Sequence, residues 1–519
     1  MIFRMEYDEL LDSFGRFGKF HWILSLFLGI TTALNAETTY MFNFLLGNHL
    51  HRCMRPDIEE DEFTHSNVSS SFNVTECSLI YNGTNEECTV WVYDQAVYTS
   101  TLISKFDMVC EDKFTRSHVM SAFFFGQMFG SAIFGFISDI FGRRLYLIVS
   151  CFLLFVSNII LPWMPNVLLV MVCQVFNAAS TIAIYNISII LVTEFVSPSY
   201  RVLANFLINM TYCIGEFLLL FEAYFLRDFK YLMIAISSPC LLCLFMFIFI
   251  PDSPRWLITK GRTNDAKRVL EKMAACNNID IDIKEEDLRI EKTKTYSFVN
   301  TLKTIVQSKQ VVIRLLILMA NWFTINLIYF GIALNIGDLG GDVFINFAIA
   351  ATTEAVALLL CLWSYKFSRK GILIWSTMVG SLSCLSTFFT SYFGGDELGW
   401  ATISLAMLGK FGITIAFFVL YIITMEMLPT TMRATLVSVC STSGKIGGLV
   451  SPYIGKLGVI LDTRFGVALP LIIFGIIGII TGVFDLFLPE TRGTRLPDTI
   501  EDIIQNDRPR DTSSTNSNR

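Results

Sequence analysis

Six ionisable side chains interrupt long apolar segments of this 519-residue sequence. Charged groups are costly in an apolar environment, so each of the six is a candidate for binding an ion. The two lysines favour a ligand with a carboxylate, and the four glutamates favour a ligand with a cationic group. Together they predict a site for a small molecule with both charges, or for a cation. The six residues are Lys410, Lys445, Glu37, Glu216, Glu222 and Glu354.

Aromatic rings in the same segments are the second group of candidate binding residues. Rings can hold an apolar body or a cationic head through cation–π attraction. Ordinary packing explains any one ring equally well, each lysine could instead form a structural ion pair with a glutamate, and Glu216 could serve helix packing. The predicted substrate site comprises Asn35, Glu222, Trp322, Tyr329, Phe330, Glu354, Lys410, Phe417, Tyr421 and Lys445.

Catalytic chemistry is not indicated by the sequence. No His or Cys dyad and no metal-ligand spacing occurs, and the chain has only five His. The sequence also lacks a phosphate-binding loop of the Gly-x-x-x-x-Gly-Lys-Ser/Thr type. We therefore expect no enzyme activity, no cofactor, no metal site and no direct use of ATP.

Composition places these residues in a polytopic membrane protein. The chain is 53% hydrophobic and 16% charged, whereas soluble domains have about 25% charged residues. Its mean hydropathy is +0.56. Long unbroken apolar runs favour helices over a transmembrane β-barrel, which needs short alternating segments. The net charge of −6 and the lack of a basic stripe argue against nucleic acid as a partner.

The predicted fold is an all-α polytopic membrane protein with about 12 transmembrane helices in two six-helix halves. The spans lie near 20–46, 117–138, 145–165, 166–192, 202–226, 231–250, 311–333, 343–364, 371–392, 398–425, 435–460 and 464–488. They divide the chain into a cytoplasmic N-terminus (1–19), an N-terminal half (20–250) with an extracellular loop (47–116), a cytoplasmic loop (251–310), a C-terminal half (311–488) and a cytoplasmic tail (489–519).

Positive charge in the short loops sets the predicted orientation. Cytoplasmic loops of membrane proteins are enriched in Lys and Arg. With a cytoplasmic N-terminus, the short inner loops contain Arg143, Arg144, Arg201, Lys366, Arg369, Lys370 and Arg433, against Arg227, Lys230 and Arg464 outside. We therefore expect a multi-pass protein of the plasma membrane with both termini in the cytoplasm.

The long extracellular loop carries sequence signals of its own. It contains three Asn-x-Ser/Thr sequons, at Asn67, Asn73 and Asn82, which predict glycosylation. It also contains four cysteines in an oxidising compartment, which predicts two disulfides with three pairings possible. These cysteines are Cys53, Cys77, Cys88 and Cys110.

An internal repeat relates the two predicted halves. Three polar segments that follow apolar spans recur in the same order about 230 residues later. The pairs are 142–144 with 368–370, 194–201 with 426–433, and 251–255 with 489–492. Duplicated halves of this kind place a binding site near the bilayer midplane, where the halves meet.

Charged residues within these repeats predict an inner gate. Acids kept at fixed spacing from arginines in both halves can form ion pairs that break and re-form as the halves move. Simple anchoring by positive charge would explain the arginines but not the acids. The predicted gate residues are Asp139, Arg143, Arg144, Glu194, Arg201, Arg255, Glu426 and Arg433.

The motif Gly-x-x-x-Asp-x-x-Gly-Arg-Arg at 135–144 resembles the signature of the major facilitator superfamily. Further segments, at 91–94, 101–111, 251–257 and 408–433, resemble the organic cation, anion and carnitine transporters within it. The stretch 223–228 is most similar to the carnitine and ergothioneine branch. Sugar porters share the Pro-Arg-Trp-Leu and Pro-Glu-Thr elements, but their loop after the first span is far shorter and their seventh span is rich in glutamine.

The resemblance implies a monomeric secondary transporter that works by alternating access, with possible coupling to sodium or a proton. Lys445 aligns with an arginine in anion and carnitine carriers and with an aspartate in cation carriers. We therefore expect a carrier that favours carnitine-like zwitterions or organic cations. An organic anion exchanger is the alternative within the family, and a transport-dead sensor or scaffold is the alternative of another class.

Overall fold

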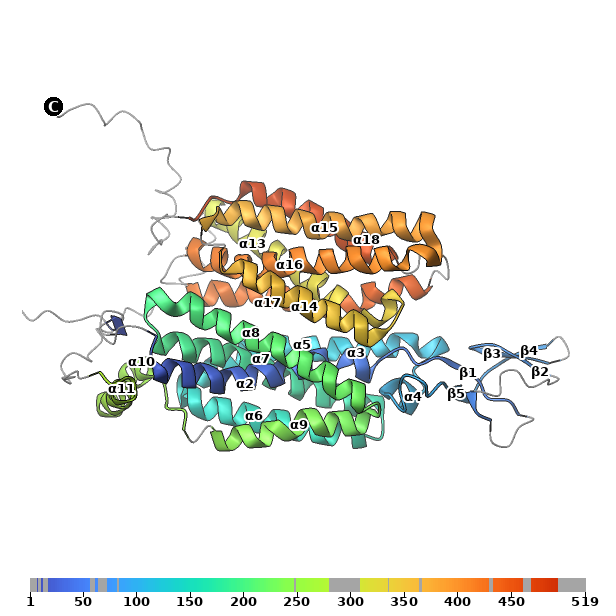
Figure 1. The fold of residues 1–519 in the computed structure, drawn as a ribbon, viewed down its shortest axis with the longest axis horizontal. Coiled ribbons are helices and arrows are strands. Elements are labelled where there is room, and N and C mark those ends of the chain that lie inside the picture. The colour runs from blue at the N-terminus through green and yellow to red at the C-terminus, as the bar shows by residue number, and fades with distance from the viewer. Residues whose placement is uncertain are drawn as a thin grey trace, which may run out of the picture.

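The computed structural model consists of two groups of long helices that lie side by side, with small β-sheets at one end (Figure 1). We call this the strand-bearing end. The opposite end carries α10 (Pro254–Thr259) and α11 (Thr263–Asn277). The structure describes residues 7, 11–12, 17–56, 61–63, 72–81, 84–246, 249–279, 309–334, 336–363, 366–428, 433–460 and 468–492.

Six long helices form each group. The N-terminal half contains α2 (Lys19–Tyr40), α5 (Lys113–Phe141), α6 (Arg143–Ile160), α7 (Val167–Phe195), α8 (Arg201–Phe225) and α9 (Phe229–Met246). The C-terminal half contains α13 (Lys309–Ala333), α14 (Val343–Cys361), α15 (Arg369–Gly394), α16 (Gly399–Met427), α17 (Arg433–Ile460) and α18 (Ala468–Phe484). Short helices α3 (Phe42–Leu45) and α4 (Leu102–Phe106) follow α2.

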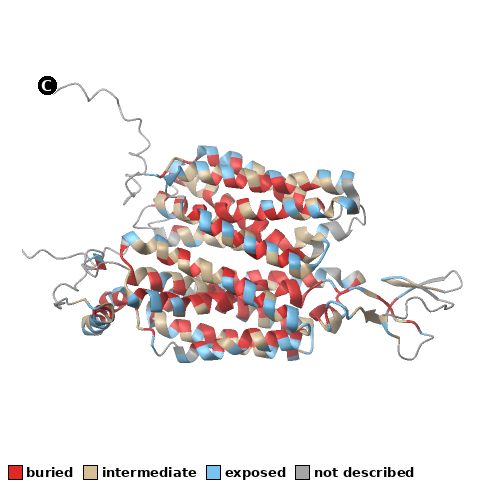
Figure 2. Cartoon of the chain, in the orientation of Figure 1, coloured by how far each residue is buried: buried red, intermediate tan, exposed pale blue. Residues whose placement is uncertain are grey.

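The apolar content of these helices confirms the predicted all-α polytopic class. Within the described ranges, eight helices are long and apolar enough to cross a membrane. The other long helices, α2, α5, α9 and α17, fall outside that group. Large apolar side chains such as Phe245, Phe393 and Trp400 are exposed on the outer faces, while buried residues lie where helices face one another (Figure 2). Such an apolar surface suits contact with lipid.

Helix ends follow local sequence signals. Asn166 and Asp342 cap α7 and α14 by accepting hydrogen bonds from backbone N–H groups in the first turn. Gly142 adopts a φ of 100° and allows the tight turn between α5 and α6. The first span differs from the prediction of one helix over 20–46, because α2 ends at Tyr40 and the chain turns at Met41 before α3.

One glycine brings α8 close to α2. A Cβ atom on Gly215 would overlap the carbonyl oxygen of Ala33, so only glycine permits this approach. Small residues serve the same purpose in other membrane helix pairs. Because Glu216 is the next residue of α8, the close approach brings its carboxyl group towards Tyr40 at the end of α2.

The loop at the strand-bearing end contains two small antiparallel sheets. Strands β1 (His51–Cys53) and β5 (Trp91–Tyr93) pair in one sheet; β2 (Phe72–Val74), β3 (Ser78–Tyr81) and β4 (Thr84–Glu87) form the other. The predicted cysteines form two disulfides, Cys53–Cys88 and Cys77–Cys110. Arg52 forms a bidentate ion pair with Asp61, and this hydrogen bonding lowers the pKa of the Asp61 carboxyl.

The predicted glycosylation sites lie mostly outside the described part of this loop. Asn67 and Asn82 are outside the described residues. Asn73 belongs to β2, and its side chain is not among those described. Glycosylation at the three sequons therefore stays a prediction.

Candidate functional site

A buried ion pair joins two helices of the C-terminal half. Lys410 on α16 lies with its Nζ 2.9 Å from Oε2 of Glu354 on α14, and the two side chains are 1% and 6% exposed. The Lys410 ammonium also faces the rings of Tyr40 and Tyr329, at 5.5 and 5.9 Å from their centres. Glu354 therefore carries the counter-charge that Lys410 needs in this apolar interior.

A chain of hydroxyl groups extends this pair across the boundary between the halves. Tyr329 on α13 donates a hydrogen bond of 2.6 Å to Oε1 of Glu354. The hydroxyl of Tyr40 on α2 lies 2.6 Å from that of Tyr329. Glu216 on α8 approaches both Tyr40 and Glu354. Four helices beside α16 thus contribute polar groups to one cluster, which consists of Tyr40, Glu216, Tyr329, Glu354 and Lys410.

Aromatic rings line one side of this cluster. Phe417 stacks on Tyr329 with ring centres 5.6 Å apart, and Trp322 contacts both Phe417 and Tyr421 edge to face. Trp322 donates its indole N–H to Thr424, which fixes the orientation of the ring. The predicted aromatic residues of α13 and α16 therefore form one continuous wall, in which Phe417 and Tyr421 remain partly exposed.

Lys445 lies at the other end of this wall. It projects from α17, with Nζ 3.0 Å from Oε1 of Gln127 on α5 and 6.0 Å from the ring centre of Phe330. Phe330 packs in turn against Tyr329 and against Phe124 of the N-terminal half. Lys445 is partly exposed and forms no ion pair within the described residues. Its charge is therefore available to an anionic group of a ligand.

Two predicted site residues take other positions. Glu222 interacts electrostatically with Glu37 instead of with either lysine, so the structure does not bring it into the Lys410 cluster. Asn35 is buried within α2, where its side-chain oxygen accepts a hydrogen bond from Thr39. Tyr40 and Gln127 were not predicted as site residues. Both are polar side chains within apolar segments, which is the signal that could have identified them.

The three repeated segments meet at the end opposite the strands. Arg143 lies 3.5 Å from Glu194 in the N-terminal half, and Arg369 lies 3.7 Å from Glu426 at the corresponding place in the C-terminal half. Asp252 accepts a hydrogen bond from the backbone N–H of Arg144, as Glu490 does from that of Arg369. The ion pairs of the repeat are thus preserved at matching positions, whereas the backbone contacts of Asp252 and Glu490 differ by one residue.

The remaining predicted gate residues lie at the same end. Arg201 and Arg433 begin α8 and α17, and Arg255 is exposed beside the ring of Tyr7. The side chains of Asp139 and Arg433 are not among those described. Burial opposes ionisation of Glu490, but hydrogen bonds from Ser368 and from three backbone N–H groups lower the pKa of its carboxyl.

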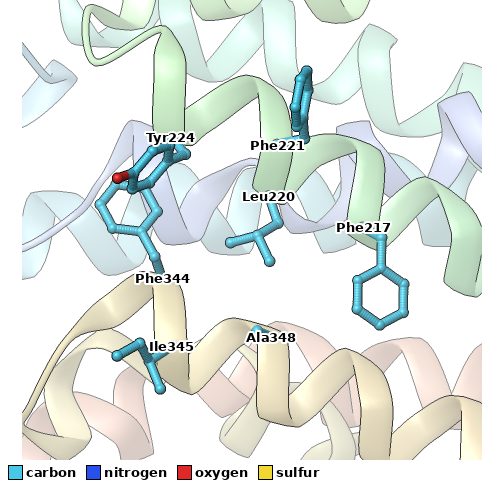
Figure 3. Close-up of a pocket in the computed structure, with 7 residues that line it drawn as sticks. All are labelled: Phe217, Leu220, Phe221, Tyr224, Phe344, Ile345 and Ala348. Atoms are coloured by element: carbon cyan, nitrogen blue, oxygen red, sulfur yellow. The ribbon is translucent and has the colours of Figure 1, made fainter.

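A separate apolar groove lies between α8 and α14 (Figure 3). It has a volume of about 410 Å³ and is lined by Phe217, Leu220, Phe221, Tyr224, Phe344, Ile345 and Ala348. No charged side chain lines it, so it does not provide the ion-binding groups found between the halves.

The fold and the buried charges define a membrane transporter of the major facilitator superfamily, and the comparisons with known proteins agree. Residues 68–501 match the family described as sugar (and other) transporters, and the chain belongs to this family. Carriers of this family are not enzymes and need no cofactor.

Individual relatives cover nearly the whole chain. Organic cation/carnitine transporter 2 of Homo sapiens is 31% identical over 96% of this chain and 94% of its own length. The organic cation transporter protein of Drosophila melanogaster is 28% identical over the same shares. Solute carrier family 22 member 2 of Mus musculus is 30% identical over 81% of this chain and 74% of its own length. The resemblance to this transporter group is therefore confirmed.

Solved structures confirm the fold. The xylose transporter XylE from E. coli, in a partially occluded inward-open conformation, superposes with a TM-score of 0.63. The two sequences are 15% identical, and the superposition covers 92% of this chain and 99% of the XylE chain. At this identity the likeness shows the fold alone.

Proposed function

We propose that this protein carries small organic ions across the plasma membrane by alternating access, and that it favours carnitine-like zwitterions or organic cations. The observation that carries the proposal is the position of Lys445. Its ammonium faces the boundary between the halves beside a neutral amide, without a carboxylate partner within the described residues. A charge in an apolar interior without a counter-charge is costly, so a ligand with a carboxylate fits there.

The rest of the site suits the cationic part of the same ligand. Phe330, Tyr329 and Phe417 form successive ring contacts that lead away from Lys445. Ring faces attract ammonium groups, most strongly where water is excluded. A zwitterion placed along this wall would set its carboxylate against Lys445 and its cationic head against the rings, near Glu354.

Contacts between the halves support a state that is closed at the strand-bearing end. Ser117 and Ser121 on α5 donate hydrogen bonds to backbone carbonyl groups of α17, at Pro452 and Leu449. His118 lies 2.8 Å from the hydroxyl of Tyr453. Phe44 stacks against Phe344 of α14. We propose that these contacts open, and the gate at the opposite end closes, during each transport cycle.

Uptake by purified protein in liposomes tests the proposal. Radiolabelled carnitine and tetraethylammonium would be offered separately, with and without sodium, and with empty liposomes as the control. Time-dependent accumulation of either compound supports the carrier function, and the sodium arm identifies that coupling ion. Binding of both compounds without any accumulation would contradict the proposal and favour a sensor.

A further inference from the structure

Glu216 is an acidic side chain that is buried at the boundary between the halves. It is 1% exposed, and neither carboxyl oxygen forms a hydrogen bond of standard geometry within the described part of the chain, although Tyr40 and Glu354 lie within reach. It lies beside Tyr40 and Glu354, and Gly215 holds its helix against α2. Buried polar groups are normally hydrogen-bonded, so an unsatisfied carboxyl at this place requires an explanation.

The hydroxyl protons beside Glu216 are already used. A tyrosine hydroxyl has one proton to donate. Tyr329 donates its proton to Glu354, so the hydrogen bond between the two tyrosines requires Tyr40 as the donor. Tyr40 therefore presents only lone pairs to Glu216. An ionised carboxylate gains nothing from them, whereas a protonated Glu216 can donate a hydrogen bond to the Tyr40 oxygen.

Charge balance also favours the protonated form of Glu216. Lys410 and Glu354 neutralise each other, so ionised Glu216 would leave one unbalanced negative charge in a buried cluster. The other titratable groups around it carry no positive charge. They are Tyr40 from α2, Tyr329 from α13, and Tyr212 and Cys213 from α8 itself. On α7, Tyr185 packs against Tyr212, and the α9 thiols of Cys240 and Cys243 face Glu37.

We propose that Glu216 holds an exchangeable proton and that this proton maintains the Tyr40–Tyr329 hydrogen bond between the halves. When Glu216 loses the proton to water, its carboxylate accepts a hydrogen bond from Tyr40. The oxygens of Tyr40 and Tyr329 then face each other with no proton between them, because Tyr329 still donates to Glu354. The bond between the halves breaks, and the strand-bearing end is free to open. That this proton serves as a coupling ion rests on the proposed carrier function.

A distance measurement between the halves tests this inference without any substrate. Spin labels would be placed at Leu50 and at Trp400, which are 59% and 69% exposed at the strand-bearing end of the two halves. Genetically encoded labels are needed, because nine described cysteines are free. In the wild type, raising the pH from mildly acidic to mildly alkaline should shift the distance distribution to longer values, since the carboxyl loses its proton.

Three variants make the test specific. Glu216→Gln should stay at the short distance at both pH values, because its amide donates to Tyr40 and does not titrate. Tyr40→Phe, which lacks the bridging hydroxyl, should show the longer distance at both. Glu37→Gln is the matched control, a buried glutamate outside the cluster, and should keep the wild-type response to pH.

Either of two results would overturn the inference: a wild-type distance that does not change with pH, or a Glu216→Gln variant that keeps the full response. If Glu216→Gln does not fold, Tyr40→Phe decides, since a pH response in that variant contradicts the proposed bond. A failure to accumulate either carnitine or tetraethylammonium would defeat the proposed function but would leave the distance result in place.

Discussion

Lys445 and Gln127 face each other across the boundary between the two halves, with Nζ 3.0 Å from Oε1. The alternative partners for this lysine, Glu222 and Glu354, do not pair with it within the described residues. Glu354 pairs with Lys410, and Glu222 lies near Glu37. This arrangement makes Lys445 the cation best placed to select a substrate by its charge.

Substitution of Lys445 should change substrate selection. We expect Lys445→Ala to reduce carnitine uptake by about tenfold or more, the range for losing a hydrogen bond to a charged group, while tetraethylammonium uptake changes much less. Lys445→Asp should shift preference further towards cations, because like charges repel the substrate carboxylate. Paired uptake assays measure both. Equal loss of the two substrates would contradict a selective role.

The ion pair between Arg143 and Glu194 should control the transport cycle and not substrate binding. Arg143→Ala should reduce uptake by about fivefold or more, as a coupling free energy of 1 kcal/mol or above would give, with surface expression largely intact. Arg369→Ala removes the equivalent pair with Glu426 and should behave alike. Asp139→Asn is expected to have the same effect. Wild-type turnover in these variants would show that the pairs have no role in gating.

The three sequons should carry glycans. The expected result is a faster-migrating band after deglycosylation of protein from a eukaryotic host. Replacing Asn67, Asn73 and Asn82 by Gln successively in the same protein should remove the shift in three steps. No change in mobility on deglycosylation would refute the prediction and would also argue against an extracellular position for this loop.

The disulfide pairing predicts which thiol each cysteine variant exposes. Cys53→Ser should free Cys88, and Cys77→Ser should free Cys110. A membrane-impermeant maleimide added to intact cells, followed by mass spectrometry of the labelled peptide, identifies the thiol. Labelling of Cys77 or Cys110 in the Cys53→Ser variant would mean that the pairs form differently.

The ion pair between Arg52 and Asp61 should stabilise the loop in a pH-dependent way. Hydrogen bonding to Arg52 lowers the pKa of Asp61 in the folded state. Its contribution is therefore fully present above the unfolded pKa of about 3.9 and is lost as the pH falls through the lower folded value. Asp61→Asn should lower the free energy of unfolding by about 1–3 kcal/mol at neutral pH. Thermal unfolding of both proteins should converge under acid, and a constant difference would contradict the assignment.

The sequence by itself determined the helices, the duplication and the residue types of the site. Apolar runs long enough to span a bilayer form helices whatever their neighbours are, because backbone groups in lipid must be satisfied within the segment. The repeat was also visible in the sequence, since Arg143 and Arg369 occupy matching positions in the two halves of the chain. The tendency of extracellular cysteines to oxidise likewise identified all four members of the disulfides.

Only the tertiary structure decided which of these side chains meet. Glu354 and Lys410 come from α14 and α16, and Tyr40 reaches Tyr329 over nearly three hundred residues of sequence. Partners of this kind depend on how each helix is rotated about its axis and how closely it packs, as Gly215 permits for α8. Helical periodicity places a residue on a face of its own helix, but it does not say which other helix that face will meet. The pairing of the cysteines, the position of Glu222 and the unsatisfied carboxyl of Glu216 were decided at that level.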